Sequence, residues 1–305
     1  MSPATWCRWR CPAFRPGEPM STTRDGRGSG LPVGDLPWSG PVTVDLPVPS
    51  SALAVGAHPD DIEFGCGATL AKWAAAGCRL HHLILTDGSK GSWDPAADLD
   101  ALVKARQQES EAAAEVIDGR PEGSDRRHDR VLFLGRVDGE LVNGVDERRA
   151  VARIIRTLRP SVVVGHDPWR RYRLHPDHRA AGFCTLDAVV AARDPHFFPE
   201  LELAPHRPQA LLLFEADQPN HVEDVHGFAQ VKIDALLCHS SQGETTMGIE
   251  PGPETEPDHV QDGEGRVDHV VQREKFARNV LHQLADHGAL AAFNAGEAFH
   301  LITEV

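Results

Sequence analysis

Two charged segments, more than a hundred residues apart, carry the residue types from which a metal centre is built. The first segment holds His58, Asp60 and Asp61, and the second holds His175 and His178. Each segment has a pair of side chains three residues apart, so the pair can converge on one point within a tight turn. Imidazole nitrogens and carboxylate oxygens suit zinc, and three protein ligands with one open position are typical of catalytic zinc. The two segments can therefore supply a histidine, an aspartate and a second histidine to one ion.

Asp60 is the carboxylate that this arrangement leaves over. A zinc ion lowers the pKa of its water to about 7, and a nearby carboxylate is suited to remove the water proton as a general base. An ion, a water molecule and a base form the machinery of amide hydrolysis. The residues therefore predict a metal-dependent hydrolase with Asp60 as its base.

Each charged segment follows a predicted buried strand. Residues 53–57 are a short apolar run, and residues 161–165 are almost entirely β-branched, as in strands of a parallel sheet. Glycines and Pro59 then interrupt the first pattern before a helical run at 69–76. Strands that alternate with helices favour a doubly wound α/β fold, with a mostly parallel sheet and helices on both faces. Ligands of such sheets bind outside the carboxyl ends of the strands, where both segments lie.

The same alternation continues along the chain. We expect further strands at 79–86, 131–135, 210–215 and 300–303, and helices at 99–117, 147–158, 179–192, 228–237 and 267–285. Residues 246–265 are rich in proline and acidic residues, which predicts a surface loop. Residues 1–45 are rich in Pro, Gly, Arg and Ser and lack periodicity, so we expect a poorly ordered extension before a single catalytic domain at 46–305. Met20 is an alternative start of translation.

Composition argues against several classes of protein. The 31 Lys and Arg residues face 45 Asp and Glu, a net charge of −14, which argues against nucleic acid or an anionic membrane as partner. No apolar run approaches the ~20 residues of a membrane-spanning helix, and the N-terminus lacks the apolar core of a secretory signal. The six scattered cysteines do not indicate a disulfide framework. We expect a cytoplasmic protein with a small-molecule partner, in a fold that is compatible with a homo-oligomer.

The two segments resemble the paired signatures of a known family. The run His58-Pro-Asp60-Asp61, followed by Gly-x-Gly-Ala, and the run His175-Pro-Asp177-His178 are similar to those of the LmbE-like or PIG-L zinc deacetylases. The resemblance covers roughly residues 50 to 245. It implies the fold of that family and an enzyme that removes an acetyl group from an N-acetylglucosamine-type amino sugar or its conjugate.

The resemblance also implies a role for each matching residue of the metal site. His58, Asp61 and His178 would ligate the zinc ion, and Asp60 would be the base that activates the water. The same ligand set accepts iron(II).

Further roles follow from the same resemblance. His175 would polarise the substrate carbonyl and stabilise the oxyanion, and Asp177 would hydrogen-bond His175 and favour its charged form. Arg106 and His239 would contact the substrate.

Several residues permit other interpretations. Arg106 and Glu109 are three residues apart and can form an ion pair on the surface of their helix. His239 can cap a helix end or face solvent. The pair Gly65 and Gly67 after a strand is a partial dinucleotide fingerprint, but its third glycine position is not a glycine.

Three alternative functions stay open, one of which is a noncatalytic relative that binds a metal or a partner. The site chemistry also suits a metal amidohydrolase for an unrelated acylated small molecule. The doubly wound fold also serves nucleotide-binding regulatory proteins. Asp87, Lys90 and Asp138 lie at predicted strand ends and can line the pocket, and its mouth can be shaped by Trp93, Trp169, Tyr172 and the loop 246–265.

Overall fold

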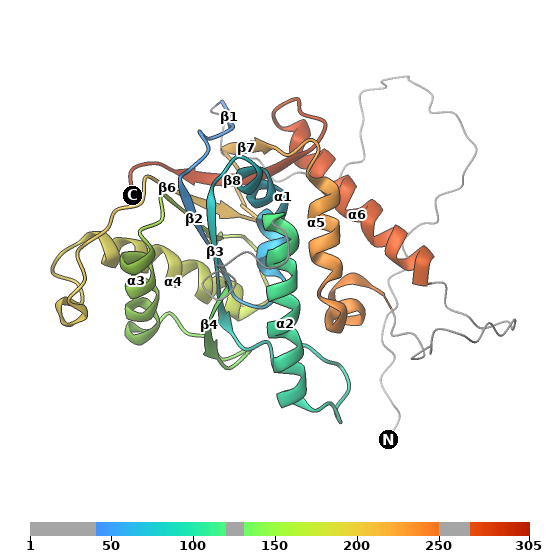
Figure 1. Ribbon diagram of the computed structural model, residues 1–305, viewed down its shortest axis with the longest axis horizontal. Coiled ribbons are helices and arrows are strands. Elements are labelled where there is room, and N and C mark those ends of the chain that lie inside the picture. Colours follow the sequence, from blue (N-terminus) through green and yellow to red (C-terminus); the bar gives the residue numbers. More distant parts are fainter. Residues whose placement is uncertain (1–40, 120–130, 250–268) are drawn as a thin grey trace, which may run out of the picture. The chain divides into compact units, whose positions relative to one another are not determined.

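The computed structural model describes residues 41–119, 131–249 and 269–305, and its strands form one mixed sheet in the order β1-β7-β8-β6-β5-β2-β3-β4 (Figure 1). The strands are β1 (Thr43–Val44), β2 (Ser51–Gly56), β3 (Arg79–Thr86), β4 (Val131–Arg136), β5 (Val162–His166), β6 (Ala210–Phe214), β7 (His221–Asp224) and β8 (Gly296–Ile302). Neighbouring strands are parallel except where β8 pairs with β6 and β7. The predicted mostly parallel α/β sheet is confirmed.

Helices cover both faces of this sheet, as predicted (Figure 1). They are α1 (Asp61–Ala75), α2 (Leu99–Asp118), α3 (Val145–Leu158), α4 (Pro176–Arg193), α5 (Ala229–Leu237) and α6 (His269–Ala289). The apolar side chains of β2 alternate between the two faces: Ala52 and Ala54 join the core under α1, α2 and α5, whereas Leu53 and Val55 join the core under α3 and α4. None of the described helices has the length and apolar character needed to cross a bilayer.

Two helices begin earlier than their sequence patterns predicted. α1 begins at Asp61 instead of residue 69, and α4 begins at Pro176 instead of residue 179. An aspartate in the first turn and a proline at the first helical position both favour a helix start. The glycines that follow do not end α1, which continues through a kink at Cys66, where φ is −150°. The charged residues therefore lie at helix N-termini and in the short turns before them.

The sheet begins inside the segment that was expected to be poorly ordered. Residues 1–40 of the predicted extension 1–45 lie outside the described residues, whereas Thr43–Val44 pair with β7. β1 and β7 have two and four residues, too few to show a strand period in the sequence. Most of the predicted loop 246–265 also lies outside the described residues. We propose that the predicted domain 46–305 is a single domain to which β1 also belongs, because every described strand joins one sheet.

The kink of α1 is stabilised by a buried ion pair. Glu297 accepts hydrogen bonds from the backbone N–H groups of Ala68 and Thr69 at 3.2 and 2.7 Å, which begin the second half of the helix. Lys232 Nζ donates to the carbonyl oxygen of Phe64 and to Glu297, both at 2.6 Å. The backbone groups that the kink frees therefore have partners, as buried polar groups require.

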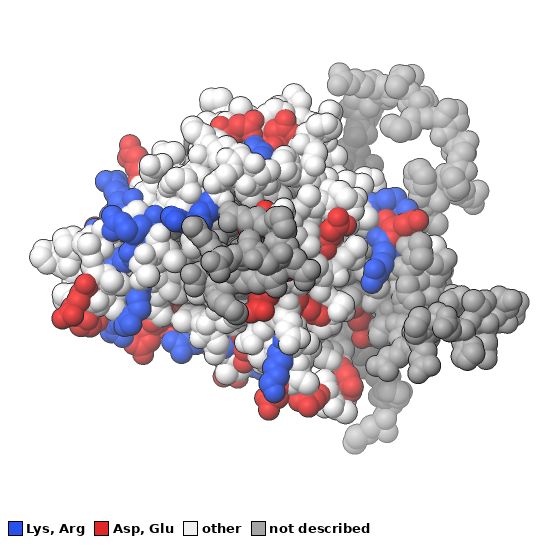
Figure 2. Space-filling view, viewed as in Figure 1, with Lys and Arg blue, Asp and Glu red and all other residues white. Residues whose placement is uncertain are grey.

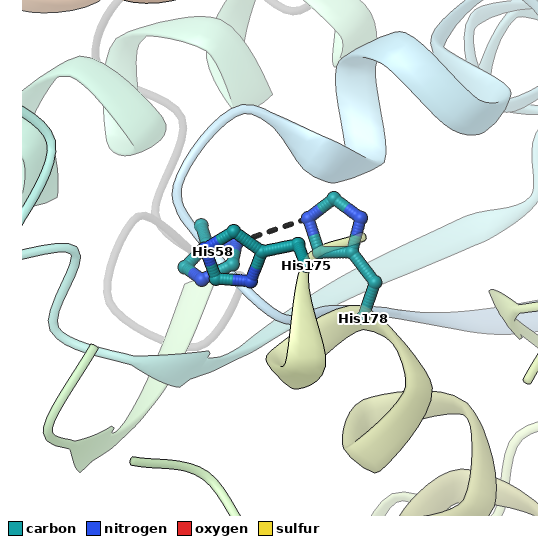
Figure 3. Close-up of side chains that lie close together, drawn as sticks. All are labelled: His58, His175 and His178. Atoms are coloured by element: carbon teal, nitrogen blue, oxygen red, sulfur yellow. Dashed lines mark hydrogen bonds between the residues drawn. The ribbon is translucent and has the colours of Figure 1, made fainter. Parts of the chain in front are cut away.

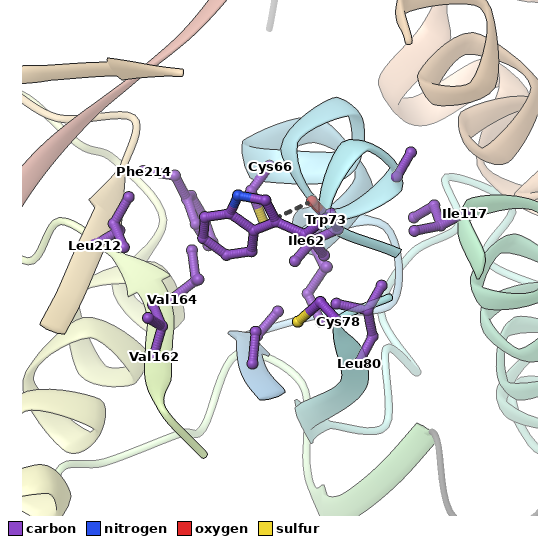
Figure 4. Packing of buried hydrophobic residues seen from close by; sticks show 14 of the residues in the cluster. Ile62, Cys66, Trp73, Cys78, Leu80, Ile117, Val162, Val164, Leu212 and Phe214 are labelled. Carbon is purple, nitrogen blue, oxygen red and sulfur yellow. Dashed lines mark hydrogen bonds between the residues drawn. The ribbon is translucent and has the colours of Figure 1, made fainter. Parts of the chain in front are cut away.

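Gly65 lets α1 approach the sheet closely beside this kink. A Cβ atom at Gly65 would lie 2.4 Å from Cδ2 of Phe214, a residue that is fully buried in the core shown in Figure 4. Gly65→Ala is expected to lower the free energy of unfolding by about 1–3 kcal/mol, because overpacking displaces the ring or the helix. Thermal unfolding measures this effect. In the matched control Gly67→Ala, the nearest atom is 3.5 Å from the new Cβ, so a smaller loss is expected; equal losses would contradict the clash.

The sheet edge carries a pH-sensitive ion cluster. Glu223 of β7 is fully buried and contacts Lys72 Nζ at 2.6 Å and His221 Nε2 at 3.0 Å. Burial by itself raises the pKa of Glu223, but the hydrogen bonds from His221 and Lys72 outweigh burial and hold this pKa below its ordinary value of 4.5. The ionised form therefore stabilises the fold above pH 4.5, and this stability is lost as the pH falls through the lowered pKa.

Glu223→Gln is expected to flatten the acid side of the stability profile. The melting temperature of the parent should fall between pH 5 and pH 3 more steeply than that of the variant, which should already be less stable at pH 7. Thermal unfolding over this range is the measurement. The exposed carboxylate of Glu304, changed to Gln, is the control. Parallel profiles for parent and Glu223→Gln would show that the cluster does not contribute.

Candidate metal centre

The structure brings the three predicted ligands together. His58 lies in the turn after β2, Asp61 is the first residue of α1, and His178 lies in the first turn of α4. His58 Nδ1 is 3.3 Å from Asp61 Oδ2 and 3.2 Å from His178 Nε2. His178 Nε2 is 3.2 Å from Asp61 Oδ1. In Figure 3 a dashed line joins the rings of His58 and His178, and the ring of His175 overlaps that of His58 in this view.

These distances match the size of a tetrahedral zinc site. Zinc bonds to nitrogen and oxygen are about 2.0–2.1 Å long, and the edges of a tetrahedron with such bonds are about 3.3–3.4 Å. His58 Nδ1 and His178 Nε2 are 3.2 Å apart, and Asp61 places Oδ2 at 3.3 Å from the first and Oδ1 at 3.2 Å from the second. Clusters able to hold a metal ion overlap with this set: His58 with His175 and His178, Asp61 with His166 and His178, and His58 with Asp138 and Asp177. The residues therefore fit one ion at this place.

Two carboxylates orient the ring of His58. Its Nε2 lies 3.2 Å from Asp138 Oδ1 and 3.2 Å from Asp177 Oδ2. Carboxylates at this position hold the proton on Nε2, which leaves the lone pair of Nδ1 directed at Asp61 and His178. The Asp177 carboxylate is buried and accepts backbone hydrogen bonds from Gly139 and Leu141. Asp177 therefore supports a predicted metal ligand.

The predicted contact between the Asp177 carboxylate and His175 is wrong. The bond between these residues runs from the backbone N–H of Asp177 to His175 Nδ1, at 3.3 Å, because His175 is the N-cap of α4. Burial lowers the pKa of His175, and the neighbouring His58 and His178 lower it further. The charge of Asp177 does raise the pKa of His175, as predicted, but it does not outweigh these lowering effects. Because Nδ1 accepts a hydrogen bond, the proton of the neutral ring lies on Nε2.

Asp60 combines burial with an unpaired oxygen. Its Oδ2 is buried without a hydrogen-bond partner, and the nearest cation is Arg106, whose Nη2 is 3.7 Å away. Burial raises the pKa of Asp60 to about 6; the Asp61 charge adds to this rise, and Arg106 opposes it. The backbone of Asp60 is left-handed, with φ of 110°, a conformation that costs energy in a residue with a side chain. Strain of this kind is often found at functional sites.

Arg106 lies inside the fold and does not pair with Glu109. It is 3% exposed and donates to the carbonyl oxygens of Gly88 at 2.9 Å and Pro59 at 2.6 Å. Glu109 instead accepts hydrogen bonds from Ser240 and Ser241. The surface ion pair that spacing allowed is therefore wrong. Arg106 joins the turn before α1 to the turn after β3 and also reaches the pocket.

His239 is buried, not exposed. Its Nε2 lies 3.4 Å from Glu63 Oε2, and it is not among the described residues that line the pocket. The charge of His239 lowers the pKa of Asp60, against the larger rise that burial causes. The interpretation of His239 as solvent-facing is therefore wrong, and its predicted contact with substrate is without support from the pocket lining.

His166 contacts a predicted ligand of the candidate metal site, although the sequence did not single it out. It ends β5, is 1% exposed, and its Nε2 lies 3.2 Å from Asp61 Oδ2. Its ring stacks on that of His178 with centroids 4.5 Å apart. A histidine that directly ends a buried β-branched strand was the available signal.

A cavity of about 370 Å³ opens over the metal site. Its size is within the range of small-molecule sites. On the face shown in Figure 2, the acidic and basic side chains of the described residues are interspersed. The cavity is lined by His58, Asp60, Asp61, Phe64, Lys90, Gly91, Trp93, Arg106, Asp138, Gly139, His175, His178, Glu215, Gln242, Thr245 and Thr246.

The chain is similar to several known deacetylases. A family model described as "PIG-L: GlcNAc-PI de-N-acetylase" matches residues 53–189. The diacetylchitobiose deacetylase of Thermococcus kodakarensis is 35% identical over 193 residues, which cover 62% of this chain and 69% of that protein. A 1D-myo-inositol 2-acetamido-2-deoxy-alpha-D-glucopyranoside deacetylase of Kineococcus radiotolerans is 35% identical over 169 residues, 48% of this chain and 46% of that protein. The chain thus matches about half the length of this second relative.

Solved structures share the fold. The N,N'-diacetylchitobiose deacetylase from Pyrococcus horikoshii aligns with a TM-score of 0.68 and 24% identity, over 84% of both chains. The 4-carboxy-2-hydroxymuconate hydratase GalB from Pseudomonas putida aligns with a TM-score of 0.59 and 19% identity, over 83% of this chain and 96% of that one. The fold alone therefore accommodates more than one reaction.

Proposed function

The chain belongs to the PIG-L family of deacetylases for N-acetylated amino sugars, and we propose on this premise that it is a zinc-dependent hydrolase that removes an acetyl group from an acetamido sugar. The main support is the convergence of His58, Asp61 and His178 to 3.2–3.3 Å beside the unpaired carboxylate oxygen of Asp60. A zinc ion held there would polarise the amide carbonyl and lower the pKa of a water molecule to about 7.

Asp60 is placed to carry out both proton transfers of amide hydrolysis. Asp60 takes a proton from the attacking water, which its raised pKa of about 6 allows near neutral pH. The water oxygen bonds to the acyl carbon, and the C–N bond then breaks. Protonated Asp60 can return its proton to the leaving nitrogen, so the products are acetate and a free amine.

His175 is suited to stabilise the negative charge that develops on the acyl oxygen. It is exposed at the pocket, and its ring centroid is 4.5 Å from that of His58. The backbone N–H of Asp177 donates a hydrogen bond to Nδ1 of His175, so the neutral ring can donate from Nε2. A neutral donor in this position agrees with the lowered pKa of His175.

His175→Ala is expected to keep its zinc and to lose on the order of 100-fold or more in kcat, because one oxyanion donor is removed. Metal content after gel filtration and initial rates of amine release measure the two properties. Tyr172→Ala is the control, since Tyr172 is 94% exposed and does not line the pocket. Loss of zinc from His175→Ala would instead place this histidine among the ligands.

A panel of acylated amines tests the proposed function directly. Amine release is measured with N-acetylglucosamine, N,N′-diacetylchitobiose, an N-acetylglucosaminyl inositol and acylated amines that contain no sugar. We expect release from acetamido sugars, loss of activity with a chelator, and recovery with added zinc. Iron(II) is tested in parallel, since the ligands accept it. Turnover of only the sugar-free amides would support an amidohydrolase of different specificity, and no turnover at all would contradict the proposal.

A further inference from the structure

A second cavity lies at the same edge of the sheet as the metal pocket. Its volume is about 420 Å³, compared with about 370 Å³ for the metal pocket. Its lining comes from the segments after β5 and β6 and from β8, whose His300 pairs with Leu213 near the carboxyl end of β6. The lining residues are Asp167, Trp169, Arg171, Asp217, Gln218 and His300. The proposed hydrolysis uses none of them.

The two cavities share one wall. The segment 167–175 and the segment 215–218 are joined by the hydrogen bond from the backbone N–H of Asp217 to Asp167, at 2.8 Å. On the metal side, Arg173 Nη2 contacts Glu215 Oε2 at 2.5 Å, and Glu215 lines the metal pocket. Two residues away in each segment, Arg171 Nε donates to Asp217 Oδ2 at 2.9 Å, and this pair lines the second cavity. Residues two positions apart in the same two segments therefore line the two cavities, which makes the cavities neighbours.

Trp169 presents an aromatic surface to the second cavity. Its side chain is 58% exposed although it is large and apolar. The ring of Phe183 holds the indole in an edge-to-face contact, with centroids 5.7 Å apart and an interplanar angle of 85°. An exposed indole that is held on one side offers a rigid apolar face with a polar N–H edge. The C–H face of a sugar ring fits such a surface.

The polar lining of this cavity suits hydroxyl groups. The carboxylates of Asp167 and Asp217, which already accept N–H groups of the protein, are acceptors, Gln218 both donates and accepts, and the guanidinium of Arg171 donates. In the described contacts Arg171 bonds Asp217 through its backbone N and Nε, so its terminal nitrogens are available. Besides His300 the lining has two carboxylates and one guanidinium, so it has no excess of fixed positive charge for a phosphate or carboxylate ligand.

We propose that this cavity binds a neutral pyranose ring, the second sugar of an oligosaccharide whose acetamido group reacts at the metal site. The proposal rests on the proposed deacetylase function and narrows its substrate class to sugars of at least two rings. An anionic conjugate such as a phosphoinositide is disfavoured by the same carboxylates.

A comparison of one-ring and two-ring substrates tests the second cavity. The zinc-loaded full chain is assayed with N-acetylglucosamine and with N,N′-diacetylchitobiose. Trp169→Ala is expected to reduce the preference for the disaccharide, as the ratio of the two kcat/KM values, by about tenfold and mainly through KM, since a stacking contact is lost. Tyr172→Ala, in the same segment but in neither cavity lining, is expected to keep the ratio. An unchanged ratio in Trp169→Ala would overturn the proposal.

A binding measurement separates this proposal from the proposed function. Asp60→Asn should bind sugars with kcat lowered by about 10²- to 10⁴-fold, so calorimetry on the zinc-loaded variant gives Kd values for both sugars before much is hydrolysed. Adding Trp169→Ala is expected to weaken diacetylchitobiose binding about tenfold relative to N-acetylglucosamine. If the parent hydrolyses neither sugar but Trp169→Ala still weakens the binding of diacetylchitobiose relative to N-acetylglucosamine, the deacetylase function fails and the sugar site stands. Equal Kd values for the two sugars, with or without Trp169, would overturn the sugar site.

Discussion

Asp61→Ala is expected to lose both its zinc and its deacetylase activity. Asp61 is the anionic member of the proposed ligand set, and its carboxylate lies within 3.3 Å of both His58 Nδ1 and His178 Nε2. Its Oδ2 also accepts the backbone N–H of His58 at 2.7 Å, so its removal frees the turn that carries the first ligand. Zinc content should fall from about one ion per chain to a small fraction, because structure and affinity of a metal site depend on every ligand.

Metal analysis after gel filtration and amine release measure the two expected losses for Asp61→Ala. Activity should fall to the background of the assay, and added zinc should restore at most a small part of it. Glu140→Ala is the matched control, since Glu140 is an exposed carboxylate at the same edge of the sheet. A variant that keeps both stoichiometric zinc and the parent rate would remove Asp61 from the metal site.

Asp60→Asn is expected to keep its zinc and to lose about 10²- to 10⁴-fold in kcat, the usual contribution of a general base. Asparagine preserves the shape of the side chain and tolerates the left-handed backbone that Asp60 adopts, so the turn should be retained. Only the capacity to accept a proton is removed. Metal content, melting temperature and single-turnover rates distinguish a lost base from a damaged fold.

The pH profile identifies Asp60 more specifically. A base acts only when ionised, so the rate of the parent should rise with pH through the pKa of Asp60. Burial places that pKa at about 6 in the ion-free protein. The positive charge of zinc favours the carboxylate, so in the loaded enzyme the acid limb should lie at or below pH 6. This limb should vanish from the residual activity of Asp60→Asn. A parent-like kcat in the variant, with an unchanged limb, would assign the base to another residue.

The sequence predicted most elements because local patterns report local structure. The strand at 79–86 has the predicted bounds, since a run of apolar residues between turn formers is recognisable within the run itself. The starts of α1 and α4 were placed too late, because Asp61 and Pro176 are equally acceptable in a turn and in a first helical turn. β1 and β7 were missed, since strands this short exist only through their neighbours.

The supporting residues of the site show the same limit. The sequence paired Asp177 with His175 because they are close in the chain, whereas the Asp177 carboxylate contacts His58, 119 residues away. It left open whether Arg106 lies on the helix surface, whereas the side chain is buried against the turns at Pro59 and Gly88. His166 reaches Asp61 only because β5 pairs with β2.

The sequence by itself determined the fold class, the family and the residue types able to hold an ion, because strand periodicity and the two charged segments are encoded over a few neighbouring positions. Only the tertiary structure decided which atoms face one another: Nδ1 of His58 toward Asp61 and His178, and Nε2 of His58 toward Asp138 and Asp177. It also decided that a second cavity lies behind the wall formed after β5 and β6. These contacts join residues that are remote in the chain, and the order and register of the strands, which no local pattern contains, bring them together.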